Sequence, residues 1–446
     1  MTSIKLTDTI TSPKRLIVIA GTTGVGKSQL SIELASKYNG EIINSDSMQM
    51  YQDIPIITNK HPINERNGIP HHIINHVPWN KEYDMHIFEK ECLSKIYDIL
   101  QRGKTPIIVG GTHYYLQVLF NNKKINNAIY FGHTNDTFTE DPNAEDDPKE
   151  LYSKLLEIDP LIASKYHPND TRRVKRMLEI YHQSNGIKPS EIFQKQQISL
   201  KFENTLFFWL YSDPTELNKR LDDRVDQMIS NGAYSEIQQL YKYYCENNKP
   251  CLESGIWQVI GFKEFLPWLL SQDTTNADDN TILYKECVEK MKLRTRQYAK
   301  RQIKWIKKML ISDIRAADKL SNFYVLNATD LNKWDQLVKD RANLICDGFF
   351  FSKNGVDQCV EHVPKGLENI VLTEECATAS ATNTNNNAKF FDKFTCSTCK
   401  DKNDENLILI GKEVWGKHLK SRRHKSNLNR GKKKKEYEEW KLKNTT

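Results

Sequence analysis

Eight consecutive residues near the N-terminus have the composition and spacing of a phosphate-binding loop. The segment Gly21-Thr-Thr-Gly-Val-Gly-Lys-Ser28 fits the pattern G-x-x-x-x-G-K-[ST]. In this pattern the glycines let backbone N–H groups surround phosphate oxygens, the lysine adds positive charge, and the hydroxyl can ligate Mg²⁺. A glycine-rich turn that only connects two elements is the alternative. The predicted phosphate ligands are Gly21, Thr22, Thr23, Gly24, Val25, Gly26, Lys27 and Ser28, with Ser28 also the Mg²⁺ ligand.

An acidic residue follows the second apolar segment of the chain. Asp46 begins the run Asp-Ser-Met-Gln49, at a position that a P-loop fold would place beside the phosphate site. A kinase or ATPase needs an aspartate after an apolar strand to hold its metal, and the segment that ends in Val109-Gly-Gly-Thr112 has none. Asp46 is therefore a candidate general base near a diphosphate. An aspartate that only caps a short helix is the alternative.

Two stretches carry basic residues at spacings that suit RNA. The first is Arg172-Arg-Val-Lys-Arg176, for which a solvated helix face is the alternative; the second holds nine Lys or Arg and no acid between Lys290 and Lys308. In the second, one helical stripe suits RNA backbone and stacked bases. The alternative places its aromatic rings in the core, with the basic side chains extending to solvent. The stripe consists of Arg294, Tyr298, Arg301, Trp305 and Lys308.

Four potential zinc ligands lie near the C-terminus. Cys396 and Cys399 are separated by two residues; His418 follows after eighteen more and His424 after a further five. Two thiolates and two imidazoles can bind one Zn²⁺ tetrahedrally, although the eighteen-residue gap exceeds the usual twelve or so. The stretch from residue 412 to 435 holds eleven Lys or Arg and one Glu, a local charge of +10 in a chain of net charge +7. This concentration of positive charge predicts binding to a polyanion.

The elements that must position these residues follow from the hydrophobic pattern. Short apolar segments at 15–20, 41–44 and 106–109 end in Gly- or Ser-containing turns and alternate with helical stretches at 27–37 and 86–102. This alternation predicts a parallel α/β sheet whose ligands lie at the carboxyl ends of the strands.

The rest of the chain predicts a helical insertion, a return to the sheet and a terminal module. Helical patterns at 151–158 and 170–182 follow a polar stretch, the sheet resumes at 205–210, Asp213-Pro-Thr-Glu216 starts a helix, and a long helix covers 281–310. The Thr/Ala/Asn-rich stretch 366–389 is typical of a linker. The predicted domains are 1–120 (P-loop domain, first part), 121–200 (helical insertion), 201–345 (second part, with the basic helix), 346–390 (linker) and 391–446 (zinc finger and basic tail). The unassigned segments are 121–150 and 271–280.

Composition limits the class of protein. The chain has 446 residues, 38% hydrophobic and 27% charged, and its longest apolar runs, such as 206–211, are far shorter than the roughly 18 residues that span a bilayer. We therefore expect no membrane association. Nine mostly isolated cysteines indicate a reducing compartment. We expect a cytoplasmic protein with further mitochondrial and nuclear pools. The short basic, Ser/Thr-rich start is compatible with an organellar presequence.

Taken together, the motifs resemble those of the tRNA dimethylallyltransferases, also called tRNA isopentenyltransferases. The resemblance covers roughly residues 15–308, and the C-terminal Cys2His2 finger, which is similar to matrin-type fingers, resembles the fungal type of the eukaryotic branch. The motifs that carry the resemblance are the loop 21–28, Asp46–Gln49, Gly110-Gly-Thr-His-Tyr-Tyr115, His167–Arg176, Trp257–Glu264 and Thr295–Trp305.

The resemblance implies transfer of a dimethylallyl group from dimethylallyl diphosphate to N6 of the adenine 3′ of the tRNA anticodon, position 37, giving N6-isopentenyladenosine. Asp46 then matches the base, and Thr23 and Arg224 match the donors that stabilise the leaving oxygen. Mg²⁺ is implied with the diphosphate, and structural Zn²⁺ in the finger. The implied or predicted tRNA contacts are Asp46, Ser47, Met48, Gln49, Thr112, Arg172, Arg173, Val174, Lys175, Arg176, Arg294 and Arg301.

Two other functions remain open at this point. One is an ATP-dependent small-molecule kinase, which would transfer a phosphoryl group; the other is a non-catalytic RNA-binding protein in which Asp46 affects no turnover. The partners expected under the main hypothesis are tRNA through its anticodon stem-loop and dimethylallyl diphosphate. We expect a monomer.

Overall fold

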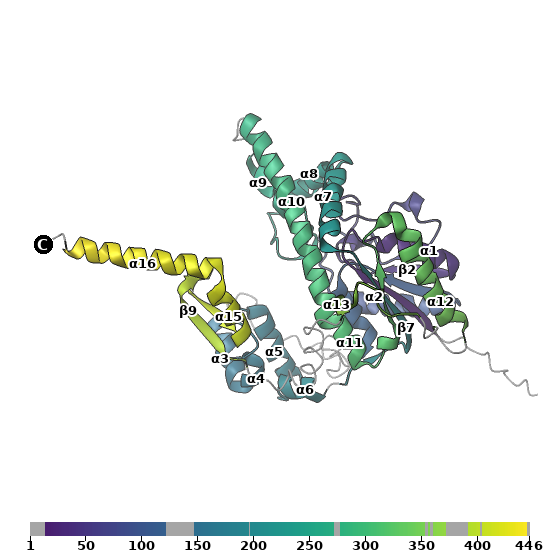
Figure 1. Cartoon of the computed structure of the whole chain (residues 1–446), viewed down its shortest axis with the longest axis horizontal. Helices are drawn as coiled ribbons and strands as arrows, with labels where there is room; N and C mark the ends of the chain where they lie inside the picture. The colour runs from purple at the N-terminus through teal and green to yellow at the C-terminus, as the bar shows by residue number, and fades with distance from the viewer. Residues whose placement is uncertain are drawn as a thin grey trace, which may run out of the picture. The chain divides into compact units, whose positions relative to one another are not determined.

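The computed structural model describes residues 14–121, 147–271, 277–371 and 391–443, apart from 196, 353–355, 357–359 and 402–403. The chain forms two compact units (Figure 1). Unit 1 consists of Met1–Ile125 and Gln197–Ser380, and unit 2 of Asn126–Gln196 and Ala381–Thr446. Residues 122–146 of the unassigned stretch 121–150 and most of the predicted linker 346–390 lie outside the described residues.

Unit 1 is built on a six-stranded parallel sheet of order β3-β2-β4-β1-β7-β8. This confirms the predicted α/β fold, because each predicted strand is present and the neighbouring strands are parallel. A short antiparallel pair, β5 (Phe120–Asn121) with β6 (Ser199–Leu200), lies where the chain leaves and re-enters unit 1. The six strands are β1 (Arg15–Gly21), β2 (Gly40–Asn44), β3 (His71–His72), β4 (Thr105–Val109), β7 (Asn204–Tyr211) and β8 (Phe323–Asn327).

Both faces of this sheet are covered by helices. Side chains alternate along β1, so that Leu16 and Val18 join one apolar cluster and Ile17 and Ile19 join another. The first cluster includes residues of α2 (Met85–Gln101), α8 (Ala233–Glu246), α9 (Phe262–Ser271) and α11 (Ile311–Ala316); the second includes residues of α1 (Lys27–Lys37) and α12 (Arg341–Phe351). A strand buried on both faces is apolar throughout, as the segment 15–20 is.

Helix α12 crosses one predicted domain boundary. It extends to Phe351, past the domain boundary predicted at 345, because Ile345 and Cys346 are both buried in the second cluster. A further short helix, α13, covers Glu368–Val371.

Two helices of unit 1 carry functional candidates. Helix α7 (Pro214–Ser230) begins as predicted: the Asp213 carboxylate accepts the N–H of Thr215 at 2.8 Å, and Pro214 occupies the first turn. The predicted long helix is α10 (Ala277–Trp305), which continues through a π-helical segment, Ile306–Leu310, into α11 (Figure 1). Residues 272–276 of the unassigned stretch 271–280 are not described.

Unit 2 combines the helical insertion with the C-terminal module. Phe391 donates its N–H to Ser164 Oγ at 3.1 Å, and the Lys393 ammonium donates to the Ala163 carbonyl at 3.1 Å and lies 3.9 Å from the centre of the Tyr152 ring. Two segments predicted as separate domains therefore share a contact surface. The elements are α3 (Pro148–Ile158), α4 (Pro160–Ala163), α5 (Thr171–Gln183), α6 (Pro189–Lys195), β9 (Lys393–Lys400), β10 (Asn406–Ile410), α15 (Lys412–Lys420) and α16 (Arg422–Lys443).

Within the described part of the chain, no helix combines the length and apolar character needed to cross a bilayer.

Candidate active site

The phosphate-binding loop connects β1 to α1, as predicted. Gly24 and Gly26 have φ of 76° and 93°, in the left-handed region that favours glycine. A methyl group on Gly24 would come within 2.7 Å of Leu221 Cδ2, and one on Gly26 within 2.6 Å of the Trp334 ring. The two glycines are therefore required both by the backbone and by close packing. The loop ends at the N-terminus of α1, where unpaired N–H groups favour an anion.

Lys27 folds back over this loop. Its ammonium donates to the Thr22 carbonyl at 2.6 Å. Burial lowers the pKa of Lys27 to about 8, and the nearby Asp46 carboxylate opposes part of that shift. A buried ammonium beside the loop favours the arrival of an anion, since the anion would compensate the lost hydration.

Asp46 lies directly after β2, in a turn held by the Asn44 side chain. Asn44 Oδ1 accepts the N–H of Asp46 at 3.1 Å, and Asn44 Nδ2 donates to the Asp46 carbonyl at 3.1 Å. Asp46 Oδ1 accepts the N–H of Met48 at 3.1 Å, so the carboxylate does cap the short 3₁₀ turn Met48–Met50. Burial raises the pKa of Asp46 above its usual 3.8, and Lys27 and Arg224 oppose that rise. A carboxylate with a raised pKa next to a phosphate loop has the character of a general base.

The end of β4 packs against the Asp46 turn. A methyl group on Gly110 would come within 2.6 Å of the Asp46 nitrogen, so only glycine allows this approach. The Thr112 hydroxyl accepts the N–H of Ser47 at 3.0 Å. The structure thus brings Asp46, Ser47 and Thr112, predicted from distant motifs, into one place.

Two side chains that the residue analysis did not single out complete this site. Gln302 of α10 donates to the Gly111 carbonyl at 2.8 Å, and its Oε1 accepts the N–H of Thr23 at 2.9 Å. His113 Nε2 accepts the N–H of Gly21 at 3.1 Å. Burial lowers the pKa of His113 to about 3, so the neutral ring can accept. Both residues lie inside motifs of the family resemblance, which was the only signal for them in the sequence.

Replacing Gln302 with leucine should destabilise unit 1. The change leaves the part-buried Thr23 N–H without its partner, at a cost of roughly 1–3 kcal/mol, and leaves the Gly111 carbonyl with only the hydrogen bond from Tyr298. Urea denaturation would measure the loss, and Gln297→Leu, at an exposed position on the same helix, is the matched control. An unchanged free energy of unfolding for Gln302→Leu would show that this bridge does not stabilise the fold.

Arg224, on α7, lies beside the phosphate-binding loop. The structure gives it no hydrogen bond to any other described residue, and burial lowers its pKa to about 10, with Asp46 opposing the shift. Arg220, one turn earlier, is occupied instead: it donates to the Ala328 carbonyl at 2.8 Å and to the Thr329 carbonyl. Of the two arginines, Arg224 is the one available to an anion.

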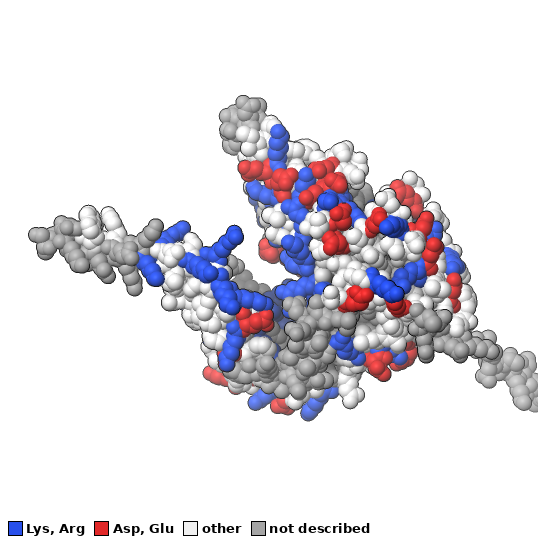
Figure 2. Space-filling view, viewed as in Figure 1, with Lys and Arg blue, Asp and Glu red and all other residues white. Residues whose placement is uncertain are grey.

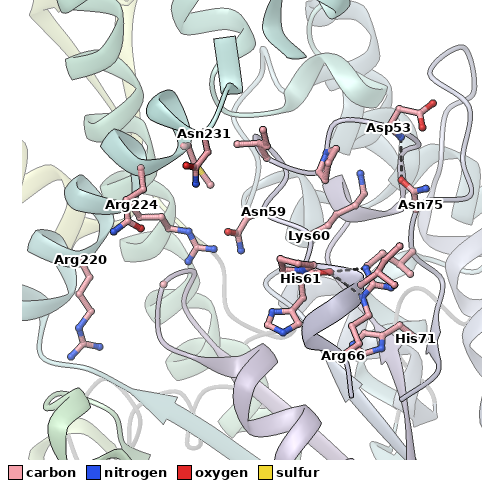
Figure 3. Close-up of a pocket in the computed structure, with 18 of the residues that line it drawn as sticks. Asp53, Asn59, Lys60, His61, Arg66, His71, Asn75, Arg220, Arg224 and Asn231 are labelled. Carbon is pink, nitrogen blue, oxygen red and sulfur yellow. Dashed lines mark hydrogen bonds between the residues drawn. The ribbon is translucent and has the colours of Figure 1, made fainter. Parts of the chain in front are cut away.

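Two adjoining cavities are lined by the phosphate-binding loop and Arg224. A cavity of about 350 Å³ is lined by the loop from Thr23 to Ser28 together with Asn44, Gln49, Lys60 and Arg224. A larger one of about 1150 Å³ shares Gly24, Lys60 and Arg224 and is shown in Figure 3, where Arg224 and Lys60 project from opposite sides. The smaller cavity can hold a diphosphate.

The basic stripe of α10 divides into two faces. Tyr298 donates to the Gly111 carbonyl at 3.2 Å, and the Trp305 ring stacks on His113 with 5.8 Å between ring centres. Arg294, Arg301 and Lys308 are exposed. The aromatic residues therefore pack against the core, which was the alternative interpretation, and only the basic residues remain for RNA.

The predicted RNA contacts of 172–176 lie on α5 in unit 2. Arg172, Arg173 and Lys175 are exposed. Arg173 is paired with Asp170, and Arg176 with Glu179 at 2.8 Å. The Val174 side chain is fully buried between the helices, so only its backbone is left for a contact with RNA.

The four predicted zinc ligands converge in unit 2. One ligand atom from each of Cys396, Cys399, His418 and His424 lies within 4.8 Å of the others. Cys396 Sγ and Cys399 Sγ lie 3.5 and 3.6 Å from His424 Nδ1. Two sulfurs and two imidazole nitrogens at these separations fit one tetrahedral Zn²⁺. Figure 2 shows Lys and Arg side chains gathered over α15 and the start of α16. The exposed ones are Lys412, Lys417, Lys420, Arg422, Arg423, Lys425 and Arg430.

Comparison with known proteins gives matches along nearly the whole chain. The IPP transferase family profile matches residues 49–309. A tRNA dimethylallyltransferase of Saccharomyces cerevisiae is 52% identical over 432 residues, which cover 96% of this chain and 95% of the relative. One of Schizosaccharomyces pombe is 37% identical and covers 94% and 96%, respectively.

A solved structure agrees with these matches. It was described as a eukaryotic dimethylallyltransferase acting on tRNA; it is 50% identical, has a TM-score of 0.77, and the match covers 96% of this chain and 99% of that one. The phosphate loop, the Asp46 turn and these matches lead to one conclusion. The chain belongs to the tRNA dimethylallyltransferase family, with the fungal enzymes.

Proposed function

We propose that this enzyme transfers the dimethylallyl group of dimethylallyl diphosphate to N6 of adenine 37 in tRNA. The observation that carries the proposal is Asp46: the Asn44 side chain holds its backbone, and its carboxylate lies beside Gly111 and is electrostatically coupled to Lys27 and Arg224. A metal-binding aspartate of a kinase would instead follow β4, where this chain has Gly110, Gly111 and Thr112.

Each partner in the proposed reaction has a group assigned to it. The bond between the allyl carbon and the diphosphate oxygen breaks, and its electron pair stays on that oxygen. The bond between the allyl carbon and N6 forms, and Asp46 takes the amine proton. Thr23 and Arg224 stabilise the charge that develops on the leaving oxygen. The N–H groups of the loop and Lys27 hold the diphosphate.

The Ser28 hydroxyl, at the start of α1 in the wall of the smaller cavity, suits Mg²⁺, which prefers oxygen ligands and binds through few protein groups together with phosphates. When bound, the ion would neutralise diphosphate charge. Ser28 would hold it, while the loop and Arg224 orient the diphosphate.

The exposed basic residues are assigned to tRNA. Arg294 and Arg301 of α10 lie in unit 1, and Arg172, Arg173, Lys175 and Arg176 in unit 2. The turn Asp46–Gln49 and Thr112 would contact the adenine, which must leave its stack to reach a buried carboxylate, at a cost of a few kcal/mol. The basic surface of α15 and α16 would bind backbone phosphates.

The test of this function is a direct assay with two donors. Purified protein, Mg²⁺ and unmodified tRNA are incubated with dimethylallyl diphosphate or with ATP, and the nucleosides of the tRNA are analysed by mass spectrometry. We expect N6-isopentenyladenosine with the first donor and no ATP hydrolysis with the second. Hydrolysis of ATP stimulated by tRNA, without prenylated adenosine, would favour the kinase alternative.

Loss of zinc should weaken tRNA binding without abolishing the chemistry. Cys396→Ser removes one of four ligands, and fingers of this size are usually unfolded without metal. We expect lower tRNA affinity at physiological salt, a smaller slope of log K against log salt, and a kcat at saturating tRNA that is within a few fold of wild type. Cys245→Ser, at an exposed cysteine of α8 in unit 1, is the control. An unchanged salt slope, or a kcat near zero, would refute this division of roles.

A further inference from the structure

One cation at the phosphate loop has no role in the mechanism so far. Lys60 lies in the wall of both cavities, opposite Arg224, and is only 8% exposed. Its ammonium has no hydrogen-bond partner among the described residues. A buried ammonium without a partner is unfavourable unless an anion arrives to compensate it.

The segment that carries Lys60 is held rigidly. The Glu236 carboxylate of α8 accepts the N–H groups of Ile56 and Ile57, each at 2.9 Å for the nearer oxygen. The N–H of Lys60 donates to the Pro55 carbonyl at 2.8 Å, and the Gln49 side chain donates to the Asn59 carbonyl at 3.1 Å. Lys60 is therefore placed by groups from two distant elements.

The charged neighbours do not neutralise Lys60. Glu236 is already used by backbone N–H groups, Asp53 is exposed, Asp46 acts only at a distance, and Arg66 is a further positive charge. Burial lowers the pKa of Lys60 to about 8 despite the three carboxylates. Arg66 itself donates twice to the His61 carbonyl, as Figure 3 shows, so it is not free to bind the same anion.

We propose that Lys60 binds the diphosphate of the prenyl donor, opposite Arg224 and above the loop Gly24–Ser28. The smaller cavity, of about 350 Å³, is large enough for a small anion. The loop, Lys60 and Arg224 all line it. A backbone phosphate of tRNA is a less suitable occupant, since Lys60 is nearly inaccessible from the surface. This inference rests on the proposed function for the identity of the donor.

The experiment compares three variants by calorimetric titration with inorganic pyrophosphate and Mg²⁺. Lys60→Met removes the charge at similar length, Lys60→Arg keeps it, and Lys90→Met changes an exposed lysine on α2. We expect pyrophosphate to bind Lys60→Met about ten- to a hundredfold more weakly, the range for a lost hydrogen bond to a charged group, and the KM for the donor to rise in parallel. Lys60→Arg should recover most of the affinity, and Lys90→Met should match wild type.

Two further measurements separate this role from others. The tRNA affinity of Lys60→Met should stay within about twofold of wild type, and its melting temperature should not fall, because the change removes an uncompensated buried charge. Three results would each overturn the proposal: an unchanged pyrophosphate affinity of Lys60→Met, a loss of tRNA affinity as large as its loss of pyrophosphate affinity, or an unfolded Lys60→Met protein. Pyrophosphate binding is measured without turnover, so a wild-type protein that binds it through Lys60 but prenylates no tRNA would contradict only the proposed function.

Discussion

Asparagine in place of Asp46 should lower the single-turnover rate of prenyl transfer by about 10² to 10³, because the adenine amine then lacks the carboxylate that takes its proton. Asparagine is a better test than alanine, since its Oδ1 can still accept the N–H of Met48. Rapid quenching with saturating donor and tRNA would measure the rate. Asp335→Asn, at an exposed carboxylate that pairs with Lys339, should match wild type. A wild-type rate in Asp46→Asn would exclude Asp46 as the base.

The pH dependence of the rate should follow the raised pKa of Asp46. Activity needs the ionised carboxylate, so the acidic limb of the kcat/KM profile should lie above pH 3.8. Burial makes ionisation of this carboxyl less favourable in the folded than in the unfolded state. The free energy of unfolding therefore falls as pH rises toward the pKa of the folded state. Asp46→Asn should therefore be at least as stable as wild type at neutral pH, although it is nearly inactive.

Replacing Arg224 with methionine should lower kcat by about 10² to 10³, with a much smaller effect on tRNA affinity. The guanidinium has no hydrogen-bond partner among the described residues and lies at the loop, where it can stabilise charge on the leaving oxygen. Because burial lowers its pKa, ionisation of Arg224 costs stability in the folded state, so the variant should not be less stable. Steady-state kinetics and thermal unfolding would measure both effects.

Arg220 supplies the matched control for this prediction. It lies one turn from Arg224, but its guanidinium is hydrogen-bonded to the carbonyls of Ala328 and Thr329. Arg220→Met should lower the free energy of unfolding by about 1.5–3 kcal/mol and change kcat only a few fold. If the two variants lost the same activity, the leaving-oxygen role of Arg224 would be contradicted.

The parts of the site that could be predicted from the sequence are local ones. The loop 21–28 is a continuous pattern between an apolar run and an amphipathic one, and Asp213 with Pro214 marks the start of α7 directly. Local hydrogen bonding and side-chain alternation determine such features, so they can be read without tertiary structure. For the same reason the parallel sheet was predicted correctly.

The parts that could not be predicted depend on contacts between distant segments. Periodicity places Tyr298, Trp305 and the basic residues on one stripe, but only the packing of α10 shows that the rings face the core. Gln302 is an ordinary helix residue until Thr23 and Gly111 come near it. Lys60 lies in a stretch without periodicity, and the segment that carries it is held by Glu236 of α8, about 180 positions away.

The bridge from Gln302 to Thr23 has a consequence for how the protein is made. The two residues are 279 positions apart. At roughly 5–20 residues per second, a ribosome would synthesise Gln302 about 14–56 seconds after Thr23. For the first 201 of these 279 positions the nascent phosphate loop would have neither this anchor nor Arg224. The growing chain would thus complete its phosphate-binding loop only after about two thirds of its residues had been synthesised, when most of α10 already exists.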